Sequence, residues 1–272
     1  MRGDPAAPVS VVNAGGASAC VLLCEHASNH IPAAYGTLGL PAEALDRHIA
    51  WDIGAADLAR RLSAQLDAPL FLAGCSRLVI DLNRPLWAPT SIPTVSEATE
   101  IPGNRDLDAA ERERREAAWF RPFHDRVARF LDRRAAAGRP ALMVGVHSFT
   151  PVFLGVPRPW HAGVLYARAA AFSRALVAQL AAGGGLEVGD NEPYRIEPEH
   201  DYTVPVHGDA RGLDAVLVEV RQDLLGSPEA RGAWAARLAA ALEAAAPRGR
   251  GPGPAPATTA ARRARPPPAG RR

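Results

Sequence analysis

Short apolar runs that end abruptly at polar residues recur along the chain. Three of them are residues 21–29 (VLLCEHASN), 141–150 (ALMVGVHSFT) and 215–223 (AVLVEVRQD). Each has the length and composition of a buried strand that delivers a loop to the edge of an α/β sheet. Because parallel strands bring their C-terminal ends to one edge, we expect His26, His147 and Glu219 to lie close together there.

Between these runs, apolar residues recur at helical spacing. The spacing predicts helices over residues 45–66, 108–137, 167–182 and 228–246. On the first of these helices, His48 and Asp52 would lie one turn apart on the same side. A further stretch over residues 69–85 predicts another strand, with residues 78–82 as its apolar part. The alternation of strands and helices indicates an α/β sheet with helices on both faces.

Length and composition fit a single folded domain followed by a tail. At 272 residues the chain is long enough for one large α/β domain, and no linker divides residues 1–246. Residues 247–272 are rich in Pro, Gly, Ala and Arg, which predicts a disordered tail. Residues 86–106 are rich in proline and hydroxyl groups and predict a long irregular loop of the kind that often has a function.

The net charge of +2 hides an uneven distribution of charges. All 31 basic residues are Arg and seven of them lie in the tail, so residues 1–246 hold 24 Arg against 29 acidic residues. This balance argues against nucleic-acid binding by the folded part. A basic tail can contact anionic surfaces, but we favour a tail without a partner.

Cysteine content and hydropathy indicate a cytoplasmic protein. Cys20, Cys24 and Cys75 form no paired framework, as expected in a reducing compartment, and we interpret them as buried thiols rather than zinc ligands. No segment reaches the ~18 uninterrupted apolar residues of a membrane span. The first residues lack the charged and apolar regions of a signal peptide. We therefore expect no membrane partner.

Two histidines at the ends of predicted strands are candidate ligands of a catalytic metal. Catalytic zinc sites usually have three protein ligands and one open position, often two His and a carboxylate. A bound zinc ion polarises a carbonyl and lowers the pKa of its water to about 7, as hydrolysis of an amide requires. His26 and His147 would supply the imidazoles. The alternative is that both are hydrogen-bonded histidines at a sheet edge, because the sequence has no compact metal motif.

Two acidic residues are candidates for the carboxylate ligand. Glu25 is adjacent to His26, and neighbours on an extended chain point in opposite directions, which argues against a shared ion. Asp52 opens the predicted helix and could turn towards the ion, with His48 as its partner or as an additional ligand. We choose Asp52; the alternative is a surface carboxylate paired with Arg47 or His48.

Glu219 lies in an otherwise apolar strand and is the candidate general base. Burial of a carboxylate raises its pKa towards the range that suits a base near pH 7, unless the group is paired. The alternative is an internal ion pair between Glu219 and an arginine. Arg221 lies two residues further along the strand, so both side chains share one face.

Asn83 and Arg84 follow an apolar segment and are suited to binding an anion. Arginine binds a carboxylate through two parallel hydrogen bonds, and a substrate with two carboxylates needs two such residues. Arg84 is the first of these, and Arg221 or Arg77 is the second. Against this interpretation, Asp81 could hold Arg84 in a structural pair.

Several sequence blocks together resemble the N-formylglutamate amidohydrolase family. They are CEHASN with Pro32, HIAWDIGA, SRLVIDLNRP, VHSFTP, NEPY and VEVRQDL, in this order from Val21 to Leu225. The resemblance implies a three-layer α/β/α sandwich with a mixed, largely parallel sheet, similar to zinc carboxypeptidases and aspartoacylases. In those relatives an H-x-x-E pair and a later His hold the metal, an Asn-Arg pair grips the substrate carboxylate and a late Glu is the base.

Carried over to this chain, the resemblance implies metal ligation by His26 and His147 and a base at Glu219. It also implies substrate binding by Asn83 and Arg84. One position departs from the pattern, because Asn29 stands three residues after His26 where the relatives have Glu. Neutral amides are uncommon zinc ligands, so we expect Asp52 to replace that glutamate.

These inferences together predict a metal-dependent hydrolase with a small-molecule substrate. The resemblance implies cleavage of N-formyl-L-glutamate, or a related N-acyl amino acid, to formate and L-glutamate, as in histidine breakdown. The expected cofactor is a divalent metal, with zinc preferred. The alternatives are a deacylase or carboxypeptidase for a bulkier acyl chain and a catalytically silent protein that binds acidic amino acids.

Overall fold

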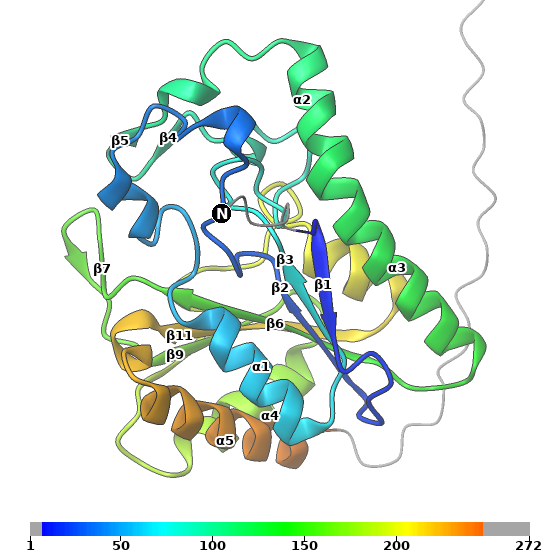
Figure 1. Cartoon of the computed structure of the whole chain (residues 1–272). Helices are drawn as coiled ribbons and strands as arrows, with labels where there is room; N and C mark the ends of the chain where they lie inside the picture. The colour runs from blue at the N-terminus through cyan, green and yellow to red at the C-terminus, as the bar shows by residue number, and fades with distance from the viewer. Residues whose placement is uncertain (1–6, 247–272) are drawn as a thin grey trace, which may run out of the picture.

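Seven strands form one mixed sheet at the centre of the molecule (Figure 1). The computed structural model describes residues 7–246, and the predicted disordered tail lies outside them. The strands of the sheet are β1 (Val9–Val12), β2 (Cys20–Cys24), β3 (Leu70–Ala73), β6 (Leu142–Phe149), β9 (Ala162–Leu165), β10 (Val188–Asp190) and β11 (Asp214–Arg221). Their order is β1-β3-β2-β6-β11-β9-β10. The four strands from β3 to β11 run parallel, and β1 and β9 pair antiparallel with β3 and β11.

Helices cover both faces of this sheet. They are α1 (Ala55–Leu66), α2 (Ala109–Arg115), α3 (Arg121–Ala136), α4 (Ala170–Ala181) and α5 (Pro228–Ala245). On one face, α1, α4 and α5 bury leucines against the valines of β6 and β11. On the other face, α3 and the long loops bury Phe123, Val127 and Leu131 together with apolar residues of β2 and β3. The predicted α/β fold, with a mixed and mostly parallel sheet between helical layers, is confirmed.

The central strands and most helices lie where the hydrophobic pattern predicts them. Strands β2, β6 and β11 are buried along almost their whole length, which explains their continuous apolar runs. The predicted helix over residues 108–137 consists of α2 and α3 joined by one π-helical turn, Glu116–Phe120. Asp108 caps α2 and Ser227 caps α5, each by accepting a backbone hydrogen bond.

The predicted helix over residues 45–66 is wrong in its first half. Helix α1 begins only at Ala55; residues 45 and 46 end a short 3-10 helix, Ala42–Asp46, and residues 47–54 form turns and bends. The backbone amide of Asp52 donates to the His26 carbonyl at 3.0 Å, and that of Arg77 donates to the Ala50 carbonyl at 3.2 Å. These bonds tie the segment to neighbouring loops, so Ile49 packs into the core from a turn rather than from a helix.

The predicted strand over residues 69–85 is also shorter than expected. Only β3 pairs with the sheet, and residues 78–82 form buried turns. The side-chain amide of Asn104 donates to the Leu78 carbonyl, which satisfies a backbone group that strand pairing would otherwise satisfy. Two short hairpins, β4 (Val95–Ser96) with β5 (Thr99–Glu100) and β7 (Val152–Phe153) with β8 (Val156–Pro157), extend from the loops.

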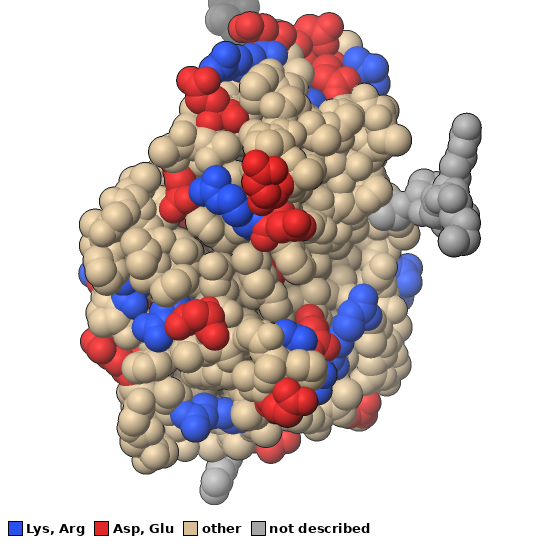
Figure 2. All heavy atoms as spheres, turned by 60° about the vertical axis from the view of Figure 1, so that its left-hand side comes forward, with Lys and Arg blue, Asp and Glu red and all other residues tan. Residues whose placement is uncertain are grey.

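The surface carries charges of both signs. On the face shown in Figure 2, acidic and basic side chains are interspersed and form no large patch of one sign. Within residues 7–246, none of the helices has the length and apolar character required to span a bilayer.

Candidate active site

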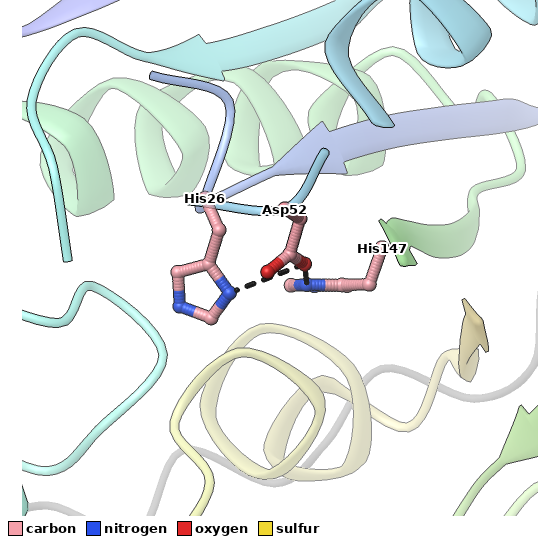
Figure 3. Close-up of side chains that lie close together, drawn as sticks. All are labelled: His26, Asp52 and His147. Carbon is pink, nitrogen blue, oxygen red and sulfur yellow. Dashed lines mark hydrogen bonds and ion pairs between the residues drawn. The ribbon is translucent and has the colours of Figure 1, made fainter. Parts of the chain in front are cut away.

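Two strand ends and the segment before α1 meet at one edge of the sheet. His26 follows β2, His147 lies in β6, and Asp52 lies three residues before α1. One ligand atom from each residue can be chosen so that all three atoms lie within 4.8 Å of one another, and all three residues are buried. Figure 3 shows the carboxylate of Asp52 reaching towards both imidazole rings.

Two imidazole nitrogens and one carboxylate oxygen converge in this cluster. Asp52 Oδ2 lies 2.8 Å from His147 Nδ1 and 3.4 Å from His26 Nδ1. The second contact lacks hydrogen-bond geometry, so the buried His26 Nδ1 has no hydrogen-bond partner among residues 7–246. Two imidazoles and a carboxylate form a donor set typical of catalytic zinc, and an orphaned imidazole nitrogen can offer its lone pair to such an ion. The cluster therefore fits a divalent metal.

The outer nitrogens of both rings also face carboxylates. His26 Nε2 bonds to Asp81 Oδ1 at 2.8 Å. His147 Nε2 lies 3.0 Å from Glu25 Oε2 but without hydrogen-bond geometry, so within residues 7–246 neither of these two atoms has a hydrogen-bond partner. Metal-binding histidines commonly have such a partner, because it fixes the tautomer and turns the other nitrogen towards the ion. Glu25 contacts the outer side of His147, whereas Asp52 lies between the inner nitrogens, which favours Asp52 as the third ligand.

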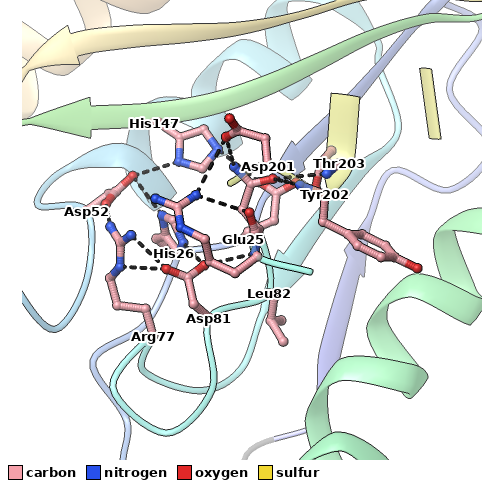
Figure 4. A network of polar contacts seen from close by, with 12 residues as sticks. Glu25, His26, Asp52, Arg77, Asp81, Leu82, His147, Asp201, Tyr202 and Thr203 are labelled. Atoms are coloured by element: carbon pink, nitrogen blue, oxygen red, sulfur yellow. Dashed lines mark hydrogen bonds and ion pairs between the residues drawn. The ribbon is translucent and has the colours of Figure 1, made fainter. Parts of the chain in front are cut away.

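Carboxylates lie around the two imidazoles (Figure 4). Glu25, Asp52 and Asp81 are all buried there, and Arg77 pairs with Asp81 at 2.7 Å and with Asp52 at 3.5 Å. Burial alone would raise the pKa of Asp52, but the neighbouring imidazoles hold it well below its usual range. Burial opposes the charged form of His147, but Asp52 and Glu25 raise its pKa well above the ordinary value. This environment favours a cation, which would displace protons from the imidazoles.

Glu219 lies beside the cluster on the neighbouring strand. It is directly opposite His147 in the pairing of β11 with β6, so both side chains project from the same face. Glu219 is 7% exposed, its Oε2 has no hydrogen-bond partner, and no arginine within residues 7–246 forms an ion pair with it. Burial raises the pKa of Glu219 to about 7. An unpaired carboxylate with this pKa can exchange a proton near neutral pH.

Asn83 holds a loop that reaches the site from a distant part of the chain. Its side-chain amide donates to Asp201 at 3.2 Å, and its carbonyl oxygen accepts from the backbone of Tyr202 and Thr203 at 3.3 and 3.0 Å. The hydroxyl of Thr203 in turn donates to Glu25 at 2.6 Å. Asn83 thus connects its own loop to the carboxylate that orients His147, and its predicted contact with substrate stays a prediction.

Arg84 lies at the margin of the same network. Its Nη1 donates to the carbonyls of Asn83 and His200 at 3.1 and 2.5 Å and lies 3.6 Å from Asp201. The predicted alternative, a pair with Asp81, is wrong because the side chain of Asp81 is taken by Arg77 and His26. Arg84 therefore keeps donors that could bind an anion.

Arg221 points to a neighbouring segment of backbone. Its Nη1 donates to the carbonyls of Arg158, Pro159 and Trp160 at 3.2, 3.3 and 3.5 Å, and its Nε donates to Asp223 at 2.9 Å. The structure therefore does not join the Arg221 guanidinium to the cluster of imidazoles and carboxylates.

Sequence patterns do not predict the contacts of several residues around the candidate site. His48 lies 3.1 Å from Glu97, so its expected partnership with Asp52 is wrong. Asp81 and Thr203 contact site residues that are 55 and 178 positions away in the chain. The one available signal is Asp81 itself, because an acid in a buried apolar segment requires a partner.

Comparison with known proteins places this site in a family context. The sequence matches the model of the family described as N-formylglutamate amidohydrolase over residues 18–226. A crystal structure of a gene product from Agrobacterium tumefaciens has a TM-score of 0.85 and 42% sequence identity, with 89% of this chain and 95% of that chain covered. The crystal structure of N-formylglutamate amidohydrolase from Ralstonia eutropha JMP134 has a TM-score of 0.63 and 18% identity, with coverages of 88% and 97%, and this likeness shows the fold alone.

Comparison with curated proteins gave no match. The family match covers most of the described residues and includes every member of the candidate site. The resemblance inferred from the sequence blocks is therefore confirmed. The chain belongs to the N-formylglutamate amidohydrolase family.

Proposed function

We propose that the protein is a metal-dependent amidohydrolase that cleaves N-formyl-L-glutamate, or a closely related N-acyl amino acid, to formate and L-glutamate. The observation that carries this proposal is the position of unpaired Glu219 directly beside the cluster of His26, Asp52 and His147. A divalent metal, with zinc preferred by this donor set, would be held by those three residues. When bound, it would polarise the scissile carbonyl and make a water molecule more acidic.

The residues of the chain provide orientation and proton transfer. Asp81 holds the imidazole of His26 through a hydrogen bond, and the charge of Glu25 lies 3.0 Å from the outer nitrogen of His147. Glu219 takes a proton from the attacking water, whose oxygen forms a bond to the formyl carbon. The same proton then passes to the amide nitrogen as the C–N bond breaks, so that formate and the free amino acid leave.

Arg84 is the residue that we assign to a substrate carboxylate. Its contacts with Asn83, His200 and Asp201 all involve Nη1, which leaves Nε and Nη2 as donors for an anion. A planar guanidinium binds a carboxylate through two parallel bonds, which orients the substrate as well as attracting it. Asn83 supports this loop and contributes to substrate orientation.

The reaction suggests a cytoplasmic role in amino-acid breakdown. Hydrolysis to formate and glutamate is the step that the family resemblance associates with histidine degradation. The three cysteines are free and buried, which is consistent with a reducing compartment. The acidic balance of residues 1–246 supports a small-molecule substrate rather than nucleic acid.

Elemental analysis combined with a formate assay tests this proposal. Purified protein should contain a divalent metal near one equivalent, and it should release formate from N-formyl-L-glutamate faster than acetate from N-acetyl-L-glutamate. Faster release of the bulkier acyl group would indicate a deacylase. Binding of acidic amino acids without metal and without product would indicate a silent binding protein.

A further inference from the structure

A buried arginine outside the predicted site has no carboxylate partner for its charge within residues 7–246. Arg158 follows the β7–β8 hairpin, and its Cζ lies 4.6 Å from the ring centroids of Phe153 and Tyr194 and 5.8 Å from that of Phe149. The residue is only 9% exposed, and its Nη1 has no hydrogen-bond partner. No carboxylate among residues 7–246 forms an ion pair with it. A buried guanidinium without an anion is costly, so this position suggests an anion that binds from outside the chain.

The ring that covers Arg158 belongs to a loop beside the proposed base. The Glu192 carbonyl approaches β9 so closely that a Cβ on Gly163 would lie 1.9 Å from its oxygen. Gly163 is the β9 residue opposite Glu219 on β11. The backbone amide of Asn191 also donates to the carbonyl of Val164 in β9 at 3.0 Å. These contacts hold the loop of Tyr194 across β9 next to the position of Glu219.

The electrostatic environment of Tyr194 agrees with this placement. Burial raises the pKa of the Tyr194 hydroxyl, and the negative charge of Glu219 raises it further, whereas Arg158 lowers it. The hydroxyl is therefore within electrostatic reach of both the proposed base and the buried arginine. Tyr194 thus links Arg158, on which its ring lies, to the neighbourhood of Glu219.

Arg221 explains how Arg158 is held in place. The three carbonyls that accept from Arg221 belong to Arg158 and the two residues that follow it. The backbone amide of Arg158 donates to Pro151 at 2.8 Å, which closes the base of the hairpin. The main chain of Arg158 is thus fixed on both sides, while part of its guanidinium stays without a partner.

We propose that Arg158 binds a carboxylate of the substrate and that Arg221 positions Arg158 rather than the substrate. This proposal rests on the proposed function and narrows its substrate class to N-acyl amino acids with two carboxylates, one held by Arg84 and one by Arg158. A guanidinium stacked between aromatic rings is already oriented, so little side-chain entropy is lost when the anion binds. The carboxylate would supply the partner that Nη1 lacks.

Calorimetric binding of three ligands to zinc-loaded protein tests the proposal. The ligands are N-formyl-L-glutamate, its γ-amide and its α-amide, and Glu219→Gln serves as the parent because it prevents turnover. The parent should bind the dicarboxylate more tightly than either amide. Arg158→Met in the parent should weaken dicarboxylate binding about 10- to 100-fold and should abolish the preference over one of the two amides. If the preference over the γ-amide is lost, Arg158 holds the γ-carboxylate. If the preference over the α-amide is lost, Arg158 holds the α-carboxylate.

Two further variants separate binding from folding and from general charge. Arg158→Lys keeps the charge and the aliphatic stem but loses the planar fork, and it should restore part of the preference. Arg237→Met removes another arginine stacked on an aromatic ring, 5.7 Å from Trp234 in α5 on the opposite face of the sheet, and it should leave the preference unchanged. If Arg158→Met does not fold, the Lys variant still tests the role of the planar fork.

The proposal is overturned if the parent binds all three ligands equally or if its preference survives in Arg158→Met and Arg158→Lys. Formate release by the wild-type protein is scored separately. Absence of formate with every N-formyl amino acid would remove the proposed function. The ligand preference of the parent and the Arg158 variants would still decide the role of Arg158.

Discussion

Each imidazole of the candidate site has a carboxylate next to both of its nitrogens. Asp52 lies on the inner side of His26 and His147, and Asp81 and Glu25 lie on their outer sides. Burial and the charge of Arg77 lower the pKa of His26, but Asp81 and Asp52 raise it overall. Glu219 differs from these acids because no imidazole or guanidinium in the described part of the chain pairs with it. The site therefore separates acids that hold the histidines from one acid that is free to exchange a proton.

Glu219→Gln should lower kcat by about 10²- to 10⁴-fold, the usual contribution of a general base. The amide has nearly the same shape but cannot accept a proton. Metal content, measured by elemental analysis, should stay the same because Glu219 is not among the proposed ligands. Turnover at the wild-type rate would remove Glu219 from the mechanism.

The pH dependence of stability should also report on Glu219. Its pKa is about 7 in the folded protein and near 4.5 when it is free, so the folded state retains a proton that the unfolded state releases between these values. Glu219 therefore makes unfolding easier as pH rises from about 4.5 to about 7, by roughly 3 kcal/mol at most.

Urea unfolding of metal-free protein at several pH values measures this effect. The stability of the wild-type protein relative to Glu219→Gln should fall across this window and become constant above pH 7. The difference between the two proteins isolates Glu219 from the other buried acids. A difference that does not change with pH would show that the Glu219 carboxylate is not held in its neutral form.

Arg84→Ala should mainly raise the KM for N-formyl-L-glutamate, by about 10- to 100-fold if a charge-assisted pair is lost. The effect on kcat should be smaller because Arg84 is assigned to the substrate carboxylate and not to the metal or to proton transfer. Arg129→Ala is a matched control, since Arg129 lies on the exposed side of α3, 3.8 Å from Asp125. Steady-state kinetics that give the same KM for Arg84→Ala and the wild type would exclude Arg84 as a substrate-binding residue.

At the scale of secondary-structure elements, the sequence predicts the central sheet better than its edges. Strands β2, β6 and β11 are fully paired and buried on both faces, which produces apolar runs that stand out. Strands β1, β9 and β10 have four, four and three residues, too few to give a distinct pattern, and their existence was not predicted. The false helix over residues 45–54 has helical spacing because Ile49 and Ala50 pack into the core from turns.

The arrangement of strands and loops determines which parts of the site can be predicted from the sequence. Parallel strands must end at one edge, so the sequence predicts that His147 and Glu219 converge there, whereas their position directly opposite each other depends on a strand order that the pattern does not predict. The partner Asp81 comes from a loop and Thr203 is the residue that opens a π-helical turn, Val204–Gly208, and no periodicity encodes the path of either segment. Arg221 lies at the end of β11, as the sequence predicts. Its guanidinium, however, contacts the backbone carbonyls of residues 158–160, which no pattern in the sequence indicates.

Gly163→Ala should disturb the contact between β9 and the loop of Tyr194. The new methyl group would lie 1.9 Å from the Glu192 carbonyl, so either the loop or the strand must move. We expect a loss of about 1–3 kcal/mol, as is usual for overpacking, together with a higher KM. Gly183→Ala is the control, because no atom lies within 4 Å of a Cβ at that position. Equal melting temperatures for the two variants would contradict the close approach.

At the scale of the whole molecule, the proposed metal ligands connect elements that are distant in sequence. His26 follows β2, Asp52 precedes α1, and His147 lies in β6, so an ion bound to all three would couple the sheet to the helix that covers it. The unfolded chain does not hold these residues together, and a metal bound by them therefore stabilises the folded state.

Zinc should raise the melting temperature of protein that has been treated with a chelator. At a free zinc concentration 100 times the dissociation constant, the stabilisation should be about 2.7 kcal/mol. His26→Ala should abolish this shift, because it removes one of three ligands. His48→Ala should retain it, since His48 pairs with Glu97 outside the cluster. Differential scanning calorimetry with and without zinc measures both variants under the same conditions. A shift that persists in His26→Ala and disappears in His48→Ala would place the metal elsewhere, and the structural role assigned to the three ligands would then be wrong.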